Sequence, residues 1–504
     1  MKKIFYFYII ELIFSYGIAA QEIYPEKTKH NFNPLIPDYI ADPSLVFFNN
    51  TYYLYATTDI DSGLFKMGIP VVWKSENFVD WSFSGTIIPG IDWDKPYYFT
   101  NNKGEQKKGY FRYWAPGKPI YRNNRYYLFP TIVKPDESLG TYVMTSDKPE
   151  GPFIFSNGTG LYFNDTINNK NETQPLINDI DGEPFVDTDG KPYIFWRRRN
   201  GSALNDSLTQ LIGNVVRIPT KFSGYSEGPV MFKRNNIYYY IYTLSGHANY
   251  CNGYMISRES PLGPFEAPKG NNVFIHSDIV NNVWGPGHGN VFRIPETDKY
   301  IFLYLEYGEG GTTRQVYANY MNFNEDGTII PVKVDPKGIG YLTNSNIKEN
   351  LALKAKIIAS SFKDDKTVTA KIIPDPNKLT TLKVNTRDGE EVKRIFSYDP
   401  ENAADGSNGT RWWAKNDDKN PWILLDLGEI KKISSCEIAF IFPTFGHTWK
   451  LEKSINGRKW EICSETKEKA IISPHIATEI GKTRYLKLYI TEGIPGIWEI
   501  KVYE

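Results

Sequence analysis

One short pattern occurs five times in the first two thirds of this 504-residue sequence. Each copy has a polar start, a short apolar segment, a turn rich in Asn or Asp-Gly, and an aromatic segment, which is typical of a β-hairpin. The turns are at Asn50, Asn124, Gly190, Asn236 and Asp298, so successive turns are 74, 66, 46 and 62 residues apart. Each interval can hold a four-stranded blade, so the repeat predicts a five-bladed β-propeller. The alternative is a β-sandwich or barrel built from aromatic hairpins.

The residues at the start of the copies are candidates for a functional site. Asp42, Asp181 and Glu227 begin the first, third and fourth copies, Trp114 begins the second, and His288 lies in the fifth. Equivalent positions of the blades point toward one central axis, so we expect the three carboxylates and His288 to meet there. Glu183 would face the same side of an extended strand as Asp181. We favour Asp181 because it precedes its apolar strand by the same offset as Asp42.

Three convergent carboxylates match the requirements of glycosidic bond cleavage. One carboxyl group must be protonated so that it can donate a proton to the leaving oxygen, and another must be ionised so that it can activate water or attack. A third negative charge nearby raises the pKa of the acid. The rival interpretation is a propeller that binds carbohydrate without catalysis, but binding sugar hydroxyl groups requires no acid of raised pKa.

The first 20 residues have the pattern of a secretory signal peptide. Lys2 and Lys3 precede an apolar run from Ile4 to Phe14, and small residues follow at Gly17-Ile18-Ala19-Ala20. Glu11 interrupts the apolar run and leaves an uncleaved membrane anchor as the alternative. No other segment approaches the roughly 18 apolar residues of a membrane span. We therefore expect an exported protein, periplasmic or extracellular, without a membrane span after signal removal.

The charge balance and the cysteine content exclude other classes of protein. The 58 basic residues equal the 58 acidic ones, so no net charge favours nucleic acid or anionic lipid, and we expect no nucleic-acid partner. Three cysteines cannot form a dense disulfide framework. Cys436 and Cys463 either pair or remain buried free thiols.

The chain divides into two predicted domains. The hairpin repeats place the propeller at residues 25–340, and a polar linker is expected at 341–349. Residues 350–504 contain short alternating segments that predict a β-sandwich. We expect the fold to be all-β and the two domains to meet through a modest interface.

The propeller region, about residues 36–335, resembles glycoside hydrolase family 43, whose members are five-bladed propellers that hydrolyse with inversion. The resemblance rests on five motifs in the family's order: Ala41-Asp42-Pro43-Ser44, Trp114-Ala115-Pro116, Ile180-Asp181-Gly182, Glu227-Gly228-Pro229 and Gly285-Pro286-Gly287-His288. It implies that Asp42 is the general base, Asp181 the aspartate that modulates the pKa of the acid, and Glu227 the general acid. Gly117 and Gly182-Glu183 depart from the family pattern and leave the bound sugar open.

The family resemblance also implies a reaction. We expect an exported, inverting exo-glycosidase that removes terminal pentose residues from plant polysaccharides, first an α-L-arabinofuranosidase, then a β-D-xylosidase, and then an exo-β-1,3-galactanase. Inversion predicts that the carboxyl groups of Asp42 and Glu227 are about 6.5–9.5 Å apart. No cofactor is expected for catalysis. The predicted substrate-binding residues are Trp73, Trp114, Trp284 and His288, with the run Arg197-Arg198-Arg199 as a further candidate.

The C-terminal region resembles the discoidin or coagulation factor 5/8 type C domain, a galactose-binding-like jelly roll similar to carbohydrate-binding module family 32. The matching segments are Asn350-Leu351-Ala352, Ala359-Ser360-Ser361, Asp405-Gly406, Thr410-Arg411-Trp412 and Trp422–Gly428, and an extra stretch from Lys363 to Lys393 interrupts the usual spacing. The resemblance implies a structural calcium ion held by Asp405 and Glu499, and the propeller family implies an ion or water on the axis near His288. The domain either binds carbohydrate or only supports the propeller.

Overall fold

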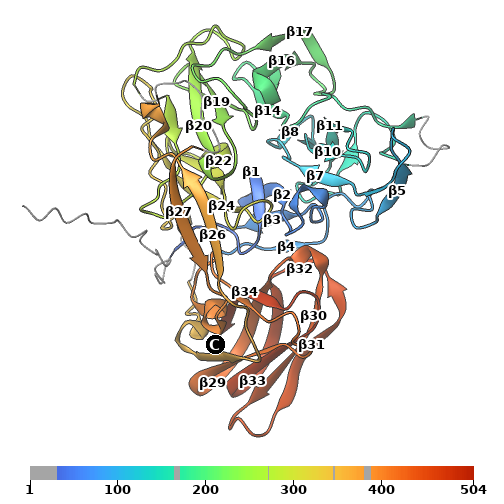
Figure 1. The fold of residues 1–504 in the computed structure, drawn as a ribbon, viewed down its shortest axis with the longest axis vertical. Helices are drawn as coiled ribbons and strands as arrows, with labels where there is room; N and C mark the ends of the chain where they lie inside the picture. The colour runs from blue at the N-terminus through green and yellow to red at the C-terminus, as the bar shows by residue number, and fades with distance from the viewer. Residues whose placement is uncertain (1–30, 164–170, 271, 344–346, 380–387) are drawn as a thin grey trace, which may run out of the picture.

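The structure is a computed structural model that describes residues 31–163, 171–270, 272–343, 347–379 and 388–504. In these ranges the regular elements are β-strands and short 3-10 helices. The propeller and the C-terminal unit are stacked along the long axis of the molecule (Figure 1). The prediction of an all-β chain, with a five-bladed propeller followed by a β-sandwich, is confirmed.

Each copy of the hairpin forms one blade of antiparallel strands around a common centre (Figure 1). Blade 1 contains β1 (Ile40–Phe48), β2 (Thr51–Thr58) and β3 (Val72–Ser75); blade 2 contains β7 (Arg112–Trp114), β8 (Ile120–Arg122), β9 (Arg125–Leu128), β10 (Thr131–Val133), β11 (Leu139–Thr141), β12 (Met144–Ser146) and β13 (Ile154–Phe155); blade 3 contains β14 (Glu183–Val186), β15 (Pro192–Trp196), β16 (Asn200–Leu204) and β17 (Leu211–Arg217); blade 4 contains β18 (Val230–Arg234), β19 (Ile237–Leu244), β20 (Cys251–Ser257) and β21 (Val273–Ile275); blade 5 contains β22 (Gly287–Arg293), β23 (Tyr300–Glu306) and β24 (Gln315–Met321).

The Asn-Asn pairs form the hairpin turns that the sequence predicts. In blade 1 the strands pair up to Phe48 and Thr51, so Asn49 and Asn50 alone make the turn. Both have positive φ, 48° and 61°, as a type I′ turn requires, and asparagine tolerates this conformation better than most residues. The corresponding pairs in blades 2 and 4 have nearly the same angles.

Blade 2 is divided into two small sheets, β7-β10-β11 and β8-β9-β12-β13. Its first strand is interrupted at Pro116 and Pro119, and its second at Pro130. Proline has no N–H group to donate to the ladder, which explains why the pairing stops at these points. Aromatic side chains fill the spaces between blades; for example, Phe274 of blade 4 packs edge-to-face on Phe302 of blade 5, with 5.1 Å between ring centroids.

The C-terminal unit is a β-sandwich with strand order β28-β34-β29-β33-β30-β31, and β25 pairs with β29. Its elements are η5 (Leu351–Lys354), β25 (Lys356–Ala359), η7 (Pro400–Ala404), β28 (Trp412–Trp413), β29 (Trp422–Phe440), β30 (His447–Ser454), β31 (Glu461–Ala470), β33 (His475–Glu492) and β34 (Gly496–Tyr503). All three cysteines are free; Cys251 and Cys436 are buried and Cys463 is partly buried. The free-thiol alternative is therefore the one observed.

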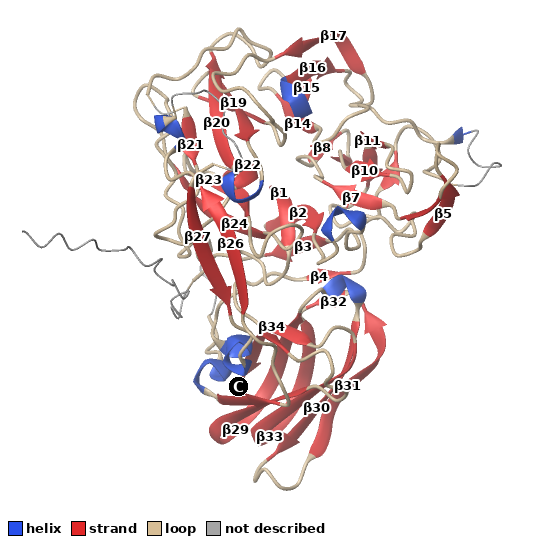
Figure 2. Cartoon of the chain, in the orientation of Figure 1, coloured by secondary structure: helices blue, strands red, loops and turns tan. Residues whose placement is uncertain are grey.

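The contact between the two units is much more extensive than the modest interface we expected. Strand β32 (Ile472–Ser473) of the C-terminal unit pairs with β4 (Phe83–Ser84) of the propeller. In addition, the hairpin β26 (Lys366–Ile372) and β27 (Glu390–Phe396) leaves the sandwich and lies along the propeller (Figures 1 and 2). The sequence gives no pattern for a strand pair that joins two domains, because the strands involved are only two residues long.

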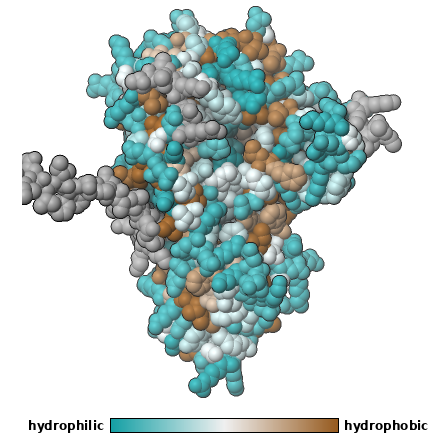
Figure 3. Space-filling view, in the orientation of Figure 1, coloured by the Kyte–Doolittle hydropathy of each residue, from teal (hydrophilic) through white to brown (hydrophobic). Residues whose placement is uncertain are grey.

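The remaining elements are short. They are η1 (Gly63–Phe65), β5 (Tyr97–Thr100), β6 (Gln106–Gly109), η3 (Arg197–Arg199), η4 (His247–Asn249), η6 (Pro376–Lys378) and η8 (Pro443–Phe445). Within the described ranges no helix has the length and apolar character to cross a membrane. The predicted signal peptide, residues 1–20, lies outside these ranges. The face shown in Figure 3 is mostly hydrophilic, with scattered hydrophobic patches.

Candidate active site

Every blade starts at the axis with one residue whose backbone is left-handed. These residues are Asp42 (φ 53°), Ala115 (36°), Asp181 (63°), Gly228 (52°) and His288 (30°). Non-glycine residues rarely adopt this conformation, and its occurrence in every blade marks a constraint of the site. Glycine is required in blade 4, because a Cβ atom on Gly228 would lie 2.5 Å from Cγ of His288. In that blade the carboxylate is therefore supplied by the preceding residue, Glu227.

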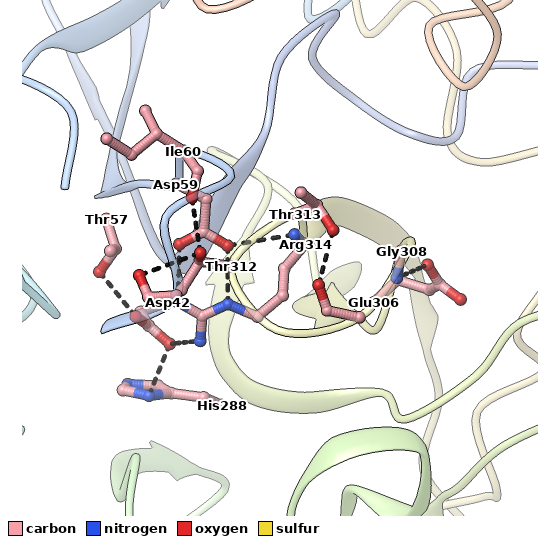
Figure 4. Close-up of polar contacts among 12 residues, drawn as sticks. Asp42, Thr57, Asp59, Ile60, His288, Glu306, Gly308, Thr312, Thr313 and Arg314 are labelled. Carbon is pink, nitrogen blue, oxygen red and sulfur yellow. Dashed lines mark hydrogen bonds and ion pairs between the residues drawn. The ribbon is translucent and has the colours of Figure 1, made fainter. Parts of the chain in front are cut away.

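Asp42 is buried and surrounded by groups that favour its charged form. The Thr57 hydroxyl donates a hydrogen bond of 2.6 Å to Oδ2, and Nδ1 of His288 lies 3.0 Å from Oδ1 (Figure 4). An Nη atom of Arg314 lies 3.6 Å from the same Oδ1. Burial alone would raise the pKa of Asp42, but the positive charges and hydrogen bonds outweigh it and hold the pKa well below its usual range. Asp42 is therefore ionised at neutral pH.

Arg314 is a functional candidate that the sequence did not reveal. Its backbone N–H, Nε and Nη2 all donate to the carboxylate of Asp59, at 3.1, 2.8 and 2.8 Å, which leaves Nη1 facing Asp42 (Figure 4). Asp59 is fully buried, and burial raises its pKa while Arg314 opposes that rise. The sequence offers one signal, the acidic residue Asp59 directly after an aromatic strand. Arg314 itself follows a loop without any repeated motif.

Glu227 has the opposite electrostatic setting to Asp42. Burial and the negative charge of Asp181 raise its pKa to about 7, against the opposing charge of His288. Its carboxyl oxygens accept hydrogen bonds from the hydroxyl groups of Tyr225 and Tyr250. The sequence did not single out either tyrosine. Near neutral pH, Glu227 is therefore able to hold a proton that it can donate.

Asp181 contacts the segment that carries Glu227. Its Oδ2 accepts a hydrogen bond of 3.1 Å from the backbone N–H of Gly228, and its own N–H donates to Oγ1 of Thr131 at 2.9 Å. Burial raises the pKa of Asp181, the charge of His288 opposes this, and Asp42 adds to the rise. Arg197 pairs with Asp179 at 2.7 Å and adds a positive charge near Asp181.

The competing carboxylate, Glu183, occupies a different place from Asp181. It accepts hydrogen bonds from the backbone N–H of Lys118 at 2.8 Å and from Nδ2 of Asn290 at 3.4 Å. Burial raises its pKa to about 7. The two departures from the family pattern face each other here, since a Cβ atom on Gly117 would lie 2.5 Å from the carbonyl oxygen of Gly182. A side chain at position 117 does not fit this backbone.

His288 lies among the three carboxylates. Burial would lower its pKa, but the negative charges of Asp42, Asp181 and Glu227 raise it to about 9. The imidazole ring is therefore a cation at neutral pH and offsets part of the negative charge. A cavity of about 10 Å³, roughly enough for one water molecule, is lined by His288, Asp42, Asp181 and Glu183.

Two of the three predicted tryptophans do not line a pocket. Trp73 is 1% exposed and packs edge-to-face on Phe83, in the core between blades 1 and 5. Trp284 is also 1% exposed and lies under the guanidinium group of Arg394, 4.2 Å from its ring centroid. These predictions are wrong because most aromatic residues of a propeller pack between blades. Trp114 is partly exposed and remains a candidate for substrate binding.

The predicted calcium ligands lie next to each other in the sandwich. Glu499 is buried, its Oε2 accepts a hydrogen bond of 3.3 Å from the N–H of Gly406, and its Oε1 has no hydrogen-bond partner among the described residues. Asp405 adds a nearby negative charge that, after burial, raises the pKa of Glu499. Such oxygen atoms suit a hard cation such as calcium. Across the described ranges, no group of three or more His, Cys, Asp or Glu side chains is arranged to hold a metal ion.

Comparison with known proteins agrees with this geometry. Residues 32–329 match a family model described as Glycosyl hydrolases family 43, and residues 387–500 match one described as F5/8 type C domain. A solved structure described as a glycoside hydrolase is 39% identical, with a TM-score of 0.80, and the match covers 94% of this chain and 99% of that one. Both units of the chain are therefore present together in that protein.

Three relatives are similar to part of the chain. A β-D-galactofuranosidase, xynD of Aspergillus niger, is 28% identical over 326 residues, covering 61% of this chain and 86% of the relative. An extracellular endo-α-(1→5)-L-arabinanase of Thermotoga petrophila is 23% identical, with 61% and 74% covered. An arabinoxylan arabinofuranohydrolase of Paenibacillus polymyxa is 25% identical, with 64% and 54% covered.

Proposed function

Because the chain belongs to glycosyl hydrolases family 43 and is therefore an enzyme that hydrolyses glycosidic bonds, we propose that it is an inverting exo-glycosidase for terminal α-L-arabinofuranosides of plant polysaccharides. The observation that carries this proposal is the contrast between two carboxyl groups at one site. Asp42 is held in its ionised form by Arg314 and His288, whereas Glu227 has a pKa raised to about 7. An ionised base and a protonated acid are the pair that inverting hydrolysis needs.

In the proposed reaction, Asp42 takes a proton from a water molecule, and the water oxygen attacks the anomeric carbon. The bond from this carbon to the leaving oxygen breaks, and that oxygen takes the proton of Glu227. Asp181 keeps Glu227 protonated before the reaction, because its negative charge disfavours a second charge nearby. A single displacement inverts the anomeric configuration. The expected separation of the Asp42 and Glu227 carboxyl groups, about 6.5–9.5 Å, remains a prediction.

The relatives support a furanoside as the substrate. The names of two relatives specify arabinan or arabinoxylan cleavage, and a third specifies β-D-galactofuranoside. β-D-Galactofuranose has the ring configuration of α-L-arabinofuranose and differs by an additional exocyclic carbon, so it is the second candidate. β-D-Xyloside and exo-acting β-1,3-galactan cleavage follow, and binding of carbohydrate without catalysis is the remaining alternative.

Export and calcium belong to the same proposal. The apolar run near the N-terminus and the extracellular relative support secretion, to the periplasm or the medium. Asp405 and Glu499 would hold a calcium ion whose charge offsets two adjacent carboxylates. For the axis, the oxygen and nitrogen atoms around His288 are the candidate ligands of an ion. Catalysis in this scheme needs only the side chains of the propeller.

Proton NMR of the sugar released from aryl glycosides tests the proposal. We would give the protein aryl α-L-arabinofuranoside, β-D-galactofuranoside and β-D-xyloside in parallel and observe the first anomer formed. Release of β-arabinose from the α-linked substrate is the expected result. Release of α-arabinose would overturn the inverting mechanism. If only one of the other two glycosides is cleaved, its sugar replaces arabinose as the proposed substrate. Glu227→Ala is the control, and turnover by this variant would show that Glu227 is not the acid. If the native protein binds sugar but cleaves no glycoside, the non-catalytic alternative holds.

A further inference from the structure

The extra stretch in the C-terminal unit forms a hairpin that belongs to neither β-sheet of the two units. Among the described residues, strands β26 and β27 pair only with each other. The hairpin crosses from the sandwich to blades 4 and 5 of the propeller (Figures 1 and 2). Val368 and Ile372 pack there with Ala248 and Trp284 of the propeller, and Ile372 is fully buried. The hairpin is therefore anchored on the catalytic domain.

A buried ion pair joins the hairpin to the end of β23. Arg394 of β27 donates from Nη2 to Oε1 of Glu306 at 2.7 Å, and from Nη1 to the carbonyl oxygen of Gly308 at 3.2 Å. Glu306 also accepts a hydrogen bond of 2.7 Å from the N–H of Gly308. Glu306 is 1% exposed, so without Arg394 its charge would have no cationic partner in the interior.

A second buried carboxylate on the same loop binds three residues of the C-terminal unit. Glu309 forms ion pairs with Arg411 and with Lys366, the latter at 2.9 Å, and accepts a hydrogen bond of 3.2 Å from the Tyr398 hydroxyl. Its other hydrogen bond, of 2.6 Å, comes from Tyr39 of the propeller. Four residues of the C-terminal unit, Arg394, Arg411, Lys366 and Tyr398, therefore contact the Glu306–Glu309 part of the connection from β23 to β24.

This loop leads directly to the guanidinium group beside the base. Thr312 donates hydrogen bonds to the carbonyl oxygens of Ile60 and Gly63, and Arg314 follows two residues later (Figure 4). Arg314 donates to Asp59 from Nε and Nη2, and its Nη1 faces Asp42. A shift of the loop would move the positive charge that keeps Asp42 ionised.

The end of β26 and the residues that follow it fix a segment beside the acid. Asn249 donates from Nδ2 to the carbonyl oxygen of Lys371 at 2.9 Å, and its Oδ1 accepts from the N–H of Ile373 at 2.9 Å. The next residue, Tyr250, is a hydrogen-bond donor to Glu227. Asn377 strengthens the attachment, since its side chain makes hydrogen bonds to both backbone groups of Val273 in β21, at 3.1 and 2.9 Å.

We propose that the C-terminal unit is a structural part of the catalytic site, in which Arg394 and Asn377 are positioning residues that hold Arg314 next to the base and Tyr250 next to the acid. This inference rests on the proposed roles of Asp42 and Glu227. It assigns to the hairpin a task separate from carbohydrate binding by the sandwich.

The test compares Arg394→Met, Arg394→Lys and Asn377→Ala in the full-length protein. In Arg394→Met the loop should shift and move Arg314 away from Asp42. The pKa of the acid limb of the kcat/KM profile, which reports Asp42, should then rise by about one pH unit, because a nearby positive charge lowers a carboxyl pKa by 1–3 units. Arg394→Lys keeps a positive charge for Glu306, so its shift should be smaller than that of Arg394→Met. Asn377→Ala leaves no buried charge unpaired, so we expect it to fold, and it should lower kcat several-fold with little change in KM. Arg484→Met is the control, since Arg484 pairs with Asp426 on the surface of the sandwich.

Hydrogen exchange supplies a readout that does not depend on turnover. In Arg394→Met and Asn377→Ala, peptides covering residues 246–250 and 306–314 should exchange faster than in the native protein and in Arg484→Met. Unchanged exchange together with unchanged pH limbs would overturn the inference, even if the native enzyme cleaves arabinofuranosides. Faster exchange in a protein that cleaves none of the glycosides would support the positioning role and reject the proposed function instead.

Discussion

The backbone N–H of Gly228 donates a hydrogen bond of 3.1 Å to Oδ2 of Asp181, so this carboxylate is fixed beside the residue that follows Glu227. The contact joins blades 3 and 4 at the axis. It explains why the charge of Asp181 is, after burial, the main factor that raises the pKa of Glu227. The consequences for pH dependence can be measured.

Replacing Asp181 by Asn should move the basic limb of the kcat/KM profile to lower pH. The variant keeps an oxygen atom for the Gly228 hydrogen bond but loses the charge, so the pKa of Glu227 falls from about 7. Less of the acid is then protonated at neutral pH, and activity at pH 7 should fall by a factor of about 10–100, with a smaller loss at pH 5. Asp187→Asn, in the same blade but paired with Lys233, is the control. An unchanged basic limb would contradict the role of Asp181.

Replacing Arg314 by Met should raise the pKa of Asp42 and leave Asp59 without its partner. The pKa of the acid limb of the kcat/KM profile should therefore rise. Urea denaturation should show that the free energy of unfolding falls by about 3–5 kcal/mol, as expected when one member of a buried ion pair is removed. In the double variant Arg314→Met/Asp59→Asn the uncompensated charge is gone. We expect it to recover stability without recovering activity at low pH. Equal activity of the native and double variants would show that Arg314 acts on stability alone.

The sandwich should lose stability as the pH falls from 6.5 to 4. Burial lowers the pKa of His447 and of His475 to about 4. In this range the unfolded chain binds protons at both positions and the folded chain does not, so acid favours unfolding. Nδ1 of His475 accepts a hydrogen bond of 3.0 Å from Trp449, and His475→Gln keeps an acceptor but does not titrate.

Scanning calorimetry at pH 7, 5.5 and 4 measures this effect. His475→Gln should show a smaller decrease in Tm than the native protein over the same range. His276→Gln, a substitution in the propeller, should follow the native curve. If His475→Gln has the same pH dependence as the native protein, the neutral buried histidine does not contribute to acid sensitivity.

Calcium should raise the Tm of the protein, and a chelator should lower it. The ion would bind the oxygen atoms at Asp405 and Glu499, where one buried Glu499 oxygen is without a hydrogen-bond partner among the described residues. Glu499→Gln should abolish the response to calcium, while Glu452→Gln, a change on the same sandwich, should not. Direct metal analysis of the purified protein would show how many ions are bound. A native protein that contains no calcium and is insensitive to chelator would refute this prediction.

Much of the fold was readable from the repeats, because each hairpin is a local unit whose turn and strands are adjacent in sequence. Asp42, Asp181, Glu227 and His288 could be found in the same way, since each lies at the start of a blade. Arg314 could not, because it follows a glycine-rich loop that belongs to no repeat. Its role depends on where that loop packs, which is decided by contacts with distant residues.

The aromatic residues show a different limit of the sequence. Trp73 and Trp284 are of the residue type that often lines sugar-binding sites, but both are buried in the core. No local sequence pattern distinguishes a tryptophan in a binding site from one in the core. Tyr225 and Tyr250 donate hydrogen bonds to Glu227, but the sequence contains 35 tyrosines and no pattern distinguishes these two from the others. The hairpin was visible only as an interruption of the C-terminal pattern. Its contact with the propeller could not be predicted, because the alternation at Val368, Ala370 and Ile372 indicates a strand but does not show what covers its apolar face.

The joint between the two units also bears on how such enzymes can be recombined in evolution. The ladder between β4 and β32 uses backbone groups and tolerates sequence drift on either side. Glu306 and Glu309 do not, since a different module packed over the same face would bury both carboxylates without the arginines that pair with them. Exchange of the sandwich for another module would therefore have to be accompanied by neutral replacements at both positions, and the two units should be inherited together.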